Sequence, residues 1–293
     1  MNIRRTMLDN FCAFILTHGR PGNVSTHDSL RSQGYTGPIY LICDDGDESL
    51  PDYIQEFGAH AVLIFNKDEI AKRIDEGENF GRRNTVLHAR IACFDFAEQL
   101  GFKYFIQLDD DYKRYCYKFN EKRQYGTWLI NDLDRVIGAM LEYYKSTPIL
   151  TFAMSQGGDH IGGYNASDKK SINTKRKAMN SFICSTDRPF QFVGTMNDDV
   201  NTYVSGSLRG EIFLTWLGVE LLQAQTQLNS GGLSDMYEES GTYVKSFYSV
   251  MYAPSCVIVK NIVAGHKRIH HKVDWGRCAP KIIRETYRKE RQA

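Results

Sequence analysis

Three adjacent carboxylates, Asp109, Asp110 and Asp111, directly follow the apolar run FIQL and are well suited to binding a cation. Like charges at the tip of a buried strand repel one another, so we expect a positive partner there. Asp109 and Asp111 are one residue apart and can turn toward a common point, and their hard oxygen atoms suit Mg²⁺ or Mn²⁺. Such an ion can bridge two phosphates and stabilise a departing diphosphate. The alternative is a solvated acidic turn.

Two other segments could bind an anionic ligand. The run THGR, which includes Thr17, His18 and Arg20, follows an apolar strand and opens a helix, so Arg20 and backbone N–H groups could face a phosphate; a capped helix start is the competing explanation. Arg82 and Arg83 precede a long helical pattern, at a position from which a diphosphate is within reach, although a solvated basic pair is equally common. Neither of the two glycine-rich phosphate-binding motifs occurs, which leaves metal and arginine to hold phosphates.

Two acidic pairs lie at the ends of other predicted elements. Asp44 and Asp45 end the second strand, where an acid could accept hydrogen bonds from a nucleobase or a ribose, although DDGDESLPD is also typical of an exposed turn. Asp198 and Asp199 precede a helix predicted to begin at Val200, where an acid can act as a general base or cap the helix.

Basic residues gather in two segments of the second half. A polar loop contributes Lys169, Lys170, Lys175, Arg176 and Lys177. After CVIVKNIV, which is predicted as the final strand, His266 could complete a metal shell, while Lys267 and Arg268 could bind phosphate; His270 and His271 are further candidates for the metal. A surface tail is the alternative.

Charge is unevenly distributed along the chain. The formal net charge is +1, but from Gly265 onward nine Lys and Arg residues face three Asp and Glu residues. An acidic partner must therefore be met by a local patch.

The spacing of the cysteines and the length of the apolar runs indicate where in the cell the protein is found. Seven cysteines are scattered, mostly within apolar runs and without a C-x-x-C pair, which predicts reduced core thiols. No stretch approaches about 18 apolar residues, so we expect no membrane span. We expect a soluble, cytoplasmic protein.

The elements that position these side chains follow from the pattern of the first half. Strands are predicted at 11–17, 38–45, 61–65 and 103–111, with helices at 66–76 and 83–100 between them. This alternation predicts a parallel, doubly wound sheet with right-handed crossovers. Ligands bind beyond the carboxyl ends of such strands. We therefore expect the loop residues 17–20, 44–45 and 109–111 to lie together at one edge of the sheet.

The second half is predicted to mix strands and helices. The expected helices are 128–146 and 234–252, and the expected strands are 112–120, 148–155, 179–186, 211–217, 219–223 and 256–263. No linker, repeat or low-complexity tract separates the halves, so a single domain is expected.

The ordered set FILTHGRPGNVSTHDSL, GRRNTVLHAR, FIQLDDDY and GTMNDDVNTY resembles the TET-associated glycosyltransferases, a phage family related to the enzyme that makes base J. The resemblance covers about residues 10 to 270. It implies an α/β, GT-A-like (Rossmann-like) fold with a mostly parallel central sheet flanked by helices and a mixed sheet on the acceptor side. It also implies one domain, 1–293, with a nucleotide-sugar-binding half at 1–112 and an acceptor-binding half with a basic C-terminal segment at 113–293.

The resemblance further implies a reaction. The donor would be a UDP-sugar, UDP-glucose above all, with Mn²⁺ or Mg²⁺, and the acceptor would be 5-hydroxymethylcytosine or 5-hydroxymethyluracil in DNA. By position, Asp109 and Asp111 match the metal and donor motif, with Asp110 also near the donor, and His266 matches a late metal ligand. Asp199 matches the base of an inverting displacement, and Asp198, which stands where Glu is usual, is the alternative.

Other readings share parts of this pattern. A GT-A enzyme acting on a glycan, a protein or a small molecule would keep the donor site and change the acceptor surface. A nucleotidylyltransferase also uses paired carboxylates but normally has a glycine-rich basic loop after the first strand, which THGRPGN matches poorly. The presence of Asp109, Asp111 and Asp199 argues against a non-catalytic DNA-binding module. For DNA, the basic segments suit phosphate contacts, and the base would be reached through the major groove or by flipping.

Overall fold

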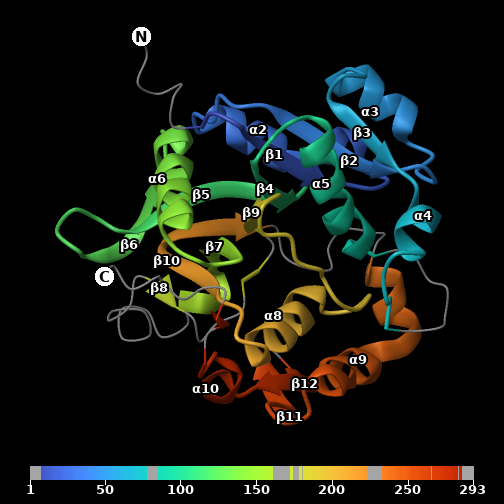
Figure 1. Ribbon diagram of the computed structural model, residues 1–293, viewed down its shortest axis with the longest axis vertical. Helices are drawn as coiled ribbons and strands as arrows, with labels where there is room; N and C mark the ends of the chain where they lie inside the picture. The colour runs from blue at the N-terminus through green and yellow to red at the C-terminus, as the bar shows by residue number, and fades with distance from the viewer. Residues whose placement is uncertain are drawn as a thin grey trace.

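The computed structural model describes residues 8–77, 85–160, 172–173, 178–179, 181–223, 233–264, 266–282 and 284–285, with the side chains of 172–173, 233–242 and 262–267 outside the description. Within these residues, ten strands form one twisted sheet that crosses the molecule, and a separate two-stranded sheet lies near its C-terminal helices (Figure 1). The predicted α/β class with helices flanking a central sheet is confirmed.

The first part of the sheet is parallel, as predicted. Its strands are β1 (Phe11–Leu16), β2 (Ile39–Asp44), β3 (Val62–Phe65) and β4 (Tyr104–Asp109), in the order β3-β2-β1-β4. The connecting helices are α2 (Ser25–Ser32), α3 (Leu50–Phe57), α4 (Lys67–Ala71) and α5 (Leu87–Gln99), with a short 3₁₀ turn η1 (Pro21–Asn23). All six residues of β1 are buried, which is typical of a parallel strand covered on both faces.

The second part continues the same sheet with mixed directions. After β4 come β9 (Ser181–Ser185), β7 (Thr151–Gln156), β10 (Phe213–Gln223), β5 (Tyr112–Phe119) and β6 (Tyr125–Leu129), with β8 (Ile172–Asn173) paired to β10. β10 is parallel to β7, and the other pairings of this part are antiparallel. The remaining elements are α6 (Leu133–Ser146), η2 (Gly157–His160), α8 (Asp198–Leu208), α9 (Leu233–Tyr252), β11 (Val257–Ala264), β12 (His266–Val273) and α10 (Trp275–Cys278).

Two apolar clusters pack on opposite faces of the sheet. Phe11, Ala13 and Ile15 of β1 belong to one cluster, whereas Cys12 and Phe14 belong to the other. This alternation follows from the two-residue period of a strand. The first cluster includes α6 side chains and the second includes side chains of α5 and α8, so helices cover both faces.

Three boundary predictions were wrong. The segment 125–129 is strand β6, and the helix after it begins at Leu133, where the Asp132 side chain accepts a hydrogen bond from the Arg135 N–H at 3.2 Å. The two strands expected at 211–217 and 219–223 are one strand, β10, whose pairing with β7 shifts register between Trp216 and Glu220. The segment CVIVKNIV, predicted as the final strand, is followed by a further strand, β12, which pairs with β11 along eight residues.

The cysteine prediction was also wrong in part. Cys256, just before β11, forms a disulfide with Cys278 in α10, while Cys12, Cys43, Cys93, Cys116 and Cys184 are buried free thiols. In the described ranges no helix is both long and apolar enough to pass through a bilayer.

Candidate active site at the carboxyl ends of the strands

The loops after β1 and β4 meet, as predicted for neighbouring parallel strands. The Thr17 hydroxyl donates to Asp110 Oδ2 at 2.8 Å, and Arg20 Nη1 donates to Asp110 Oδ1 at 3.2 Å. Burial raises the pKa of Asp110, although Arg20 and Thr17 oppose the shift. Asp110 therefore fastens the first loop to the tip of β4, which leaves Asp109 and Asp111 on either side of it.

The start of α2 fixes the turn that carries the three acids. The Thr26 hydroxyl donates to the Asp109 carbonyl at 2.6 Å and accepts from the Tyr112 N–H at 2.9 Å, and the Thr26 N–H donates to the Asp110 carbonyl at 3.1 Å. One side chain thus satisfies backbone groups on both sides of the turn. Backbone groups held in this way cannot easily rotate, so the carboxylates keep their directions.

Asp44 is paired on both of its oxygens. His18 Nδ1 lies 2.6 Å from Oδ2, and Lys67 Nζ lies 2.9 Å from Oδ1. Burial opposes ionisation of this carboxyl, but the hydrogen bonds from His18 and Lys67 outweigh it and lower the pKa of Asp44 to about 2. The bond to Asp44 likewise raises the pKa of His18. The neighbouring Asp45 is exposed and hydrogen-bonds to Asn66, so it is the more open acceptor of the pair.

Arg90, in the first turn of α5, joins the two acidic motifs and was not predicted from the sequence. Its Nε donates to Asp198 Oδ2 at 2.7 Å, and its Nη2 donates to Asp109 Oδ1 at 3.1 Å. The guanidinium lies 4.9 Å from the ring centre of Phe182 and 5.4 Å from that of Phe192. Although burial opposes its charge, Asp198 and Asp109 raise the pKa of Arg90.

The residues at the tip of β4 fit a divalent cation. Asp111 Oδ2 accepts from Gln223 at 3.0 Å, while Asp111 Oδ1 is buried without a hydrogen-bond partner in the described part of the chain. Burial, with the nearby Asp111, Asp198 and Asp110, raises the pKa of Asp109 to about 7 in spite of Arg90. A bound cation would stabilise both groups: the ionised form of Asp109, and the buried Asp111 Oδ1, for which the described residues supply no donor.

No group of three or more His, Cys, Asp or Glu side chains is poised to hold a metal within the ranges that the structure describes. Mg²⁺ is commonly held by one or two carboxylates together with substrate phosphates. Asp109 and Asp111 therefore match a metal that arrives with a diphosphate. Of the histidines considered for the metal, His270 and His271 lie in β12 with ring centres 4.2 Å apart, and the side chain of His266 lies outside the described set.

Asp198 and Asp199 form the start of α8, two positions earlier than the predicted helix start. The preceding Asn197 has a left-handed backbone (φ 52°), and its amide donates to the Lys245 carbonyl at 2.9 Å and to the Ser249 hydroxyl at 3.2 Å, both on α9. Asp198 is buried, and half-buried Asp199 accepts from the Val200 N–H at 2.8 Å. The helix start favours negative charge on both acids.

Comparison with known proteins assigns the chain to a family. Residues 11–232 match the model of the TET-associated glycosyltransferases. The chain belongs to the TET-associated glycosyltransferase family. No curated protein matches the sequence.

Solved structures similar to this TET-associated glycosyltransferase are distant in sequence. A mannosyltransferase from Pyrobaculum calidifontis, in complex with GDP-Man and Mn²⁺, is 11% identical with a TM-score of 0.49, over 83% of this chain and 64% of that one. Glucosyl-3-phosphoglycerate synthase from Mycobacterium tuberculosis, in complex with Mg²⁺ and UDP, is 8% identical with a TM-score of 0.47, over 93% of this chain and 92% of that one. At these values the likeness adds nothing to the family assignment.

Several predicted site residues lie outside the described part of this family member. They are Arg82, Arg83, Lys169, Lys170, Lys175, Arg176 and Lys177, together with the side chains of His266 and Lys267. Arg268 lies in β12 and its Nε is buried.

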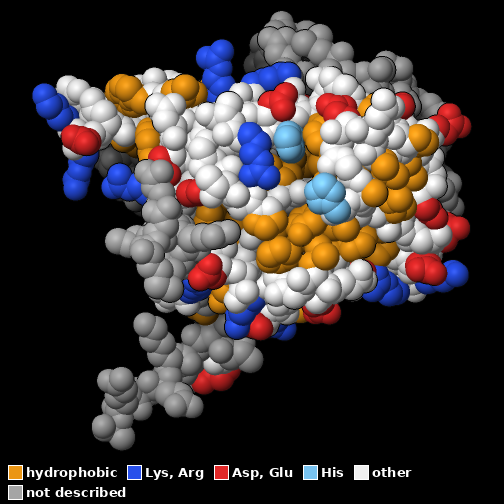
Figure 2. Space-filling view, turned by 90° about the horizontal axis from the view of Figure 1, so that it is seen from above, with side chains coloured by type: hydrophobic (Ala, Val, Ile, Leu, Met, Phe, Trp, Pro, Cys, Tyr) orange, Lys and Arg blue, Asp and Glu red, His pale blue; other side chains and the backbone are white. Residues whose placement is uncertain are grey.

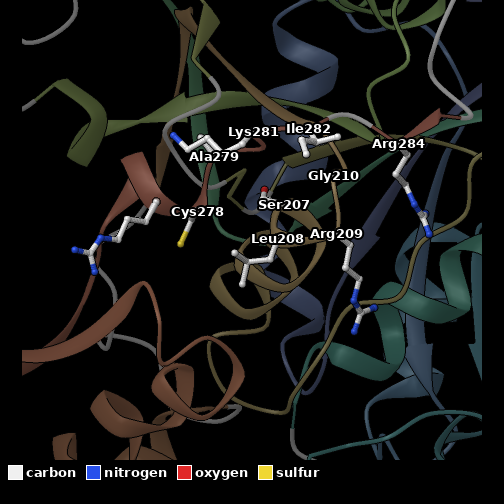
Figure 3. A pocket seen from close by; sticks show the side chains of 10 residues that line it. Ser207, Leu208, Arg209, Gly210, Cys278, Ala279, Lys281, Ile282 and Arg284 are labelled. Atoms are coloured by element: carbon white, nitrogen blue, oxygen red, sulfur yellow. The ribbon is translucent and has the colours of Figure 1, made fainter.

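A basic hollow lies at the other end of α8 from the acids. Its volume is about 300 Å³, and four cations line it, with Arg209 and Arg284 extending to one side and Lys281 to the other (Figure 3); the fourth is Arg277. Glu211 pairs with Arg284 at 3.1 Å and offsets part of this charge. Because a helix rises about 1.5 Å per residue, the length of α8 sets the hollow roughly 16 Å from the acids.

Proposed function

We propose that this protein is a metal-dependent glycosyltransferase that moves glucose from UDP-glucose to the hydroxymethyl group of 5-hydroxymethylcytosine or 5-hydroxymethyluracil in DNA, with inversion. The observation that carries the proposal is that one arginine, Arg90, binds both Asp109 at the tip of β4 and Asp198 at the start of α8, in a chain of a glycosyltransferase family.

In this proposal the rim formed by the first half, residues 1–112, holds the donor. Asp109 and Asp111 would hold Mn²⁺ or Mg²⁺, which when bound supplies positive charge to the departing diphosphate. Arg20, held at Asp110, adds a second cation on the same rim. Asp45, beside the paired Asp44, would accept hydrogen bonds from the nucleoside.

The chemical step is a single displacement at the anomeric carbon. The acceptor oxygen forms a bond to this carbon while the bond to the UDP oxygen breaks, and the electron pair leaves with UDP. Asp199 takes the proton of the acceptor hydroxyl. Because attack and departure occur on opposite faces, the sugar is inverted.

The acceptor-binding half, residues 113–293, would meet DNA through its cations. The hollow around Arg209 and Lys281 adds to the basic segments recognised in the sequence, and Lys and Arg contacts to phosphate supply much of DNA affinity. Seen from above, Lys and Arg side chains are scattered around a broad apolar area (Figure 2). That face of the described molecule therefore offers little to a polyanion, which favours an approach from another side.

The test supplies labelled UDP-glucose and Mn²⁺ together with duplexes that contain cytosine, thymine, 5-hydroxymethylcytosine or 5-hydroxymethyluracil. We expect label in a hydroxymethylated duplex and none in the other two. Transfer to a glycan, protein or small molecule, but to no hydroxymethylated DNA, would replace the acceptor and keep the donor site.

Asp111→Asn tests the metal site directly. Since the substitution removes the charge of one proposed ligand, we expect Mn²⁺-dependent UDP binding to fall by about tenfold or more in calorimetry. Asp187→Asn, which changes a 58% exposed acid paired with Lys103, is the matched control and should bind UDP normally. Equal UDP binding by Asp111→Asn and the control would remove Asp111 from the site.

A further inference from the structure

We propose that Arg90 is the positioning residue that couples the donor site to the proton-accepting acid, and that by holding Asp198 it leaves Asp199 to take the proton. The inference rests on the proposed function for its catalytic part. Nothing in the comparisons assigns a role to Arg90.

The guanidinium of Arg90 reaches two separate acidic motifs. Arg90 is 1% exposed and starts from α5, yet its two donor nitrogens end on different motifs, Asp109 at the tip of β4 and Asp198 at the start of α8. These acids are 89 positions apart in the sequence. One planar group therefore fixes the relative position of the metal carboxylate and the acidic helix start.

Arg90 is itself held in place by its neighbours. The rings of Phe182 and Phe192 pack against the guanidinium, and Gln107 in β4 donates to the Arg90 backbone carbonyl at 2.9 Å. Side chains from β9, from β4 and from the loop before α8 thus hold it in one orientation. Such support from surrounding residues is what a positioning group requires.

The two acids at the start of α8 differ in burial and in their contact with Arg90. Asp198 is 6% exposed, and its Oδ2 lies 2.7 Å from Arg90 Nε, so this oxygen is engaged in a buried, charge-assisted bond. Asp199 is half-buried at the same helix start and therefore more accessible to an acceptor. A base must reach the hydroxyl that it deprotonates, which favours Asp199.

A lysine cannot replace this arginine. Its ammonium is a single point charge, whereas the arginine uses two nitrogens in a fixed fork to reach two carboxylates. Arg90→Lys keeps the buried positive charge, which protects the fold, but it replaces two donor nitrogens by one and cannot reproduce both bonds in their present geometry. Arg73→Lys, at an exposed arginine paired with Asp95, is the matched control.

The experiment measures folding, donor binding and turnover in four variants: Arg90→Lys, Arg73→Lys, Asp198→Asn and Asp199→Asn. Folding is followed by circular dichroism, Mn²⁺ binding by electron paramagnetic resonance, UDP binding by calorimetry and turnover with a hydroxymethylated duplex. Asp198→Asn retains an oxygen that can accept from Arg90 Nε, so it preserves the positioning contact while removing a possible base.

We expect Arg90→Lys to remain folded, to weaken Mn²⁺ and UDP binding, and to lower kcat by about 100-fold through misplacement. We expect Asp199→Asn to lower kcat by about 100-fold or more with UDP binding unchanged, and Asp198→Asn to lower it by less than about tenfold. A purely structural arginine would change the unfolding transition and leave metal and UDP binding of the folded protein intact.

Two results would overturn the inference. One is wild-type binding and turnover in Arg90→Lys; the other is a loss of kcat in Asp198→Asn as large as in Asp199→Asn. If wild type transfers glucose to no hydroxymethylated duplex, the proposed function fails, and the binding measurements still decide whether Arg90 supports the donor site. Absence of Mn²⁺-dependent UDP binding in wild type would overturn both.

Discussion

Asp44 shows how contacts with two neighbours set the charge of a single side chain. Burial alone would raise the pKa of Asp44, but the hydrogen bonds from His18 and Lys67 lower it to about 2. The unfolded chain has a value of about 3.9. The folded state therefore gains stability from ionised Asp44 above the unfolded value, and loses that gain as the pH falls through about 2.

Asp44→Asn should destabilise the protein by about 2 kcal/mol near pH 7, because the ion pairs of Asp44 are lost. The difference from wild type should narrow to roughly half by about pH 3, because below about pH 3.9 the unfolded wild-type chain takes up a proton on Asp44 while the folded protein stays largely ionised. Urea unfolding across this range measures the effect. Asp45→Asn, at the exposed neighbour, is the control, and an Asp44→Asn difference independent of pH would contradict the assigned pairing.

The acids of the candidate site could be found from the sequence, whereas the residue that joins them could not. Asp44, Asp109 and Asp111 were predictable because the carboxyl ends of parallel strands share a rim. Arg90 lies in the segment LHARIACF, in a helix that is buried on most sides. The hydrophobic pattern of such a helix does not show whether an arginine in it faces the interior or the solvent. Its partners come from β4 and α8, so the pairing is a property of the tertiary structure.

At the scale of elements, hydrogen bonds between α9 and the loop before α8 fix the direction of α8. The Tyr248 hydroxyl on α9 accepts from the Thr195 N–H at 3.0 Å, and Asn197 donates to two other α9 groups. Asparagine tolerates the left-handed backbone that Asn197 adopts better than most residues. The direction of the acidic helix start therefore depends on residues of α9 that lie more than forty positions later in the chain.

Asn197→Ala should cost about 2 kcal/mol of stability, since it loses two hydrogen bonds and places a Cβ-bearing residue without a polar side chain in the left-handed region. Asn197→Gly loses the same hydrogen bonds without the backbone penalty, so it should cost about 1 kcal/mol less than the alanine variant. Urea unfolding of both proteins compares them. Equal losses would show that the backbone conformation contributes nothing.

The disulfide gives a prediction at the same scale. Denatured, unreduced protein should expose five thiols to Ellman's reagent, and reduced protein seven. Because Cys256 and Cys278 are 22 residues apart, Cys278→Ser should destabilise the β11–β12 hairpin region by about 3 kcal/mol. Seven reactive thiols before reduction would contradict the bond.

Elements were predictable where burial dictates the pattern. β1 to β4 are apolar on both faces and stand out against polar turns, but β12 reads HKRIHHKV and has little apolar content to mark it as a strand. It forms because its backbone pairs with β11 in register. Likewise Trp128 and Leu129 in β6 form an apolar run that suits either a strand or a helix.

At the scale of the whole molecule, α8 links two regions of opposite charge. Carboxylates crowd its first turn, and Arg209, Arg277, Lys281 and Arg284 surround the hollow beyond its last turn. If DNA is the acceptor, as proposed, its phosphates would lie at the hollow while the target base lies near the acids.

Arg209→Glu should weaken duplex binding and reduce the slope of log affinity against log salt by about one, because roughly one phosphate contact is lost. UDP binding should not change. Lys103→Glu, which reverses one exposed charge just before β4, at the opposite end of that strand from the acids, is the control. Equal salt slopes for the two variants would place DNA elsewhere. Fluorescence anisotropy at several salt concentrations provides the measurement.

The crowding of acids around Arg90 has a kinetic consequence. Asp109, Asp110, Asp111, Asp198 and Asp199 face two described arginines, Arg20 and Arg90, so the rim carries an excess of negative charge. A diphosphate that approaches without a counterion meets repulsion at this rim. In the proposed reaction we therefore expect the cation to bind first or to arrive with the nucleotide.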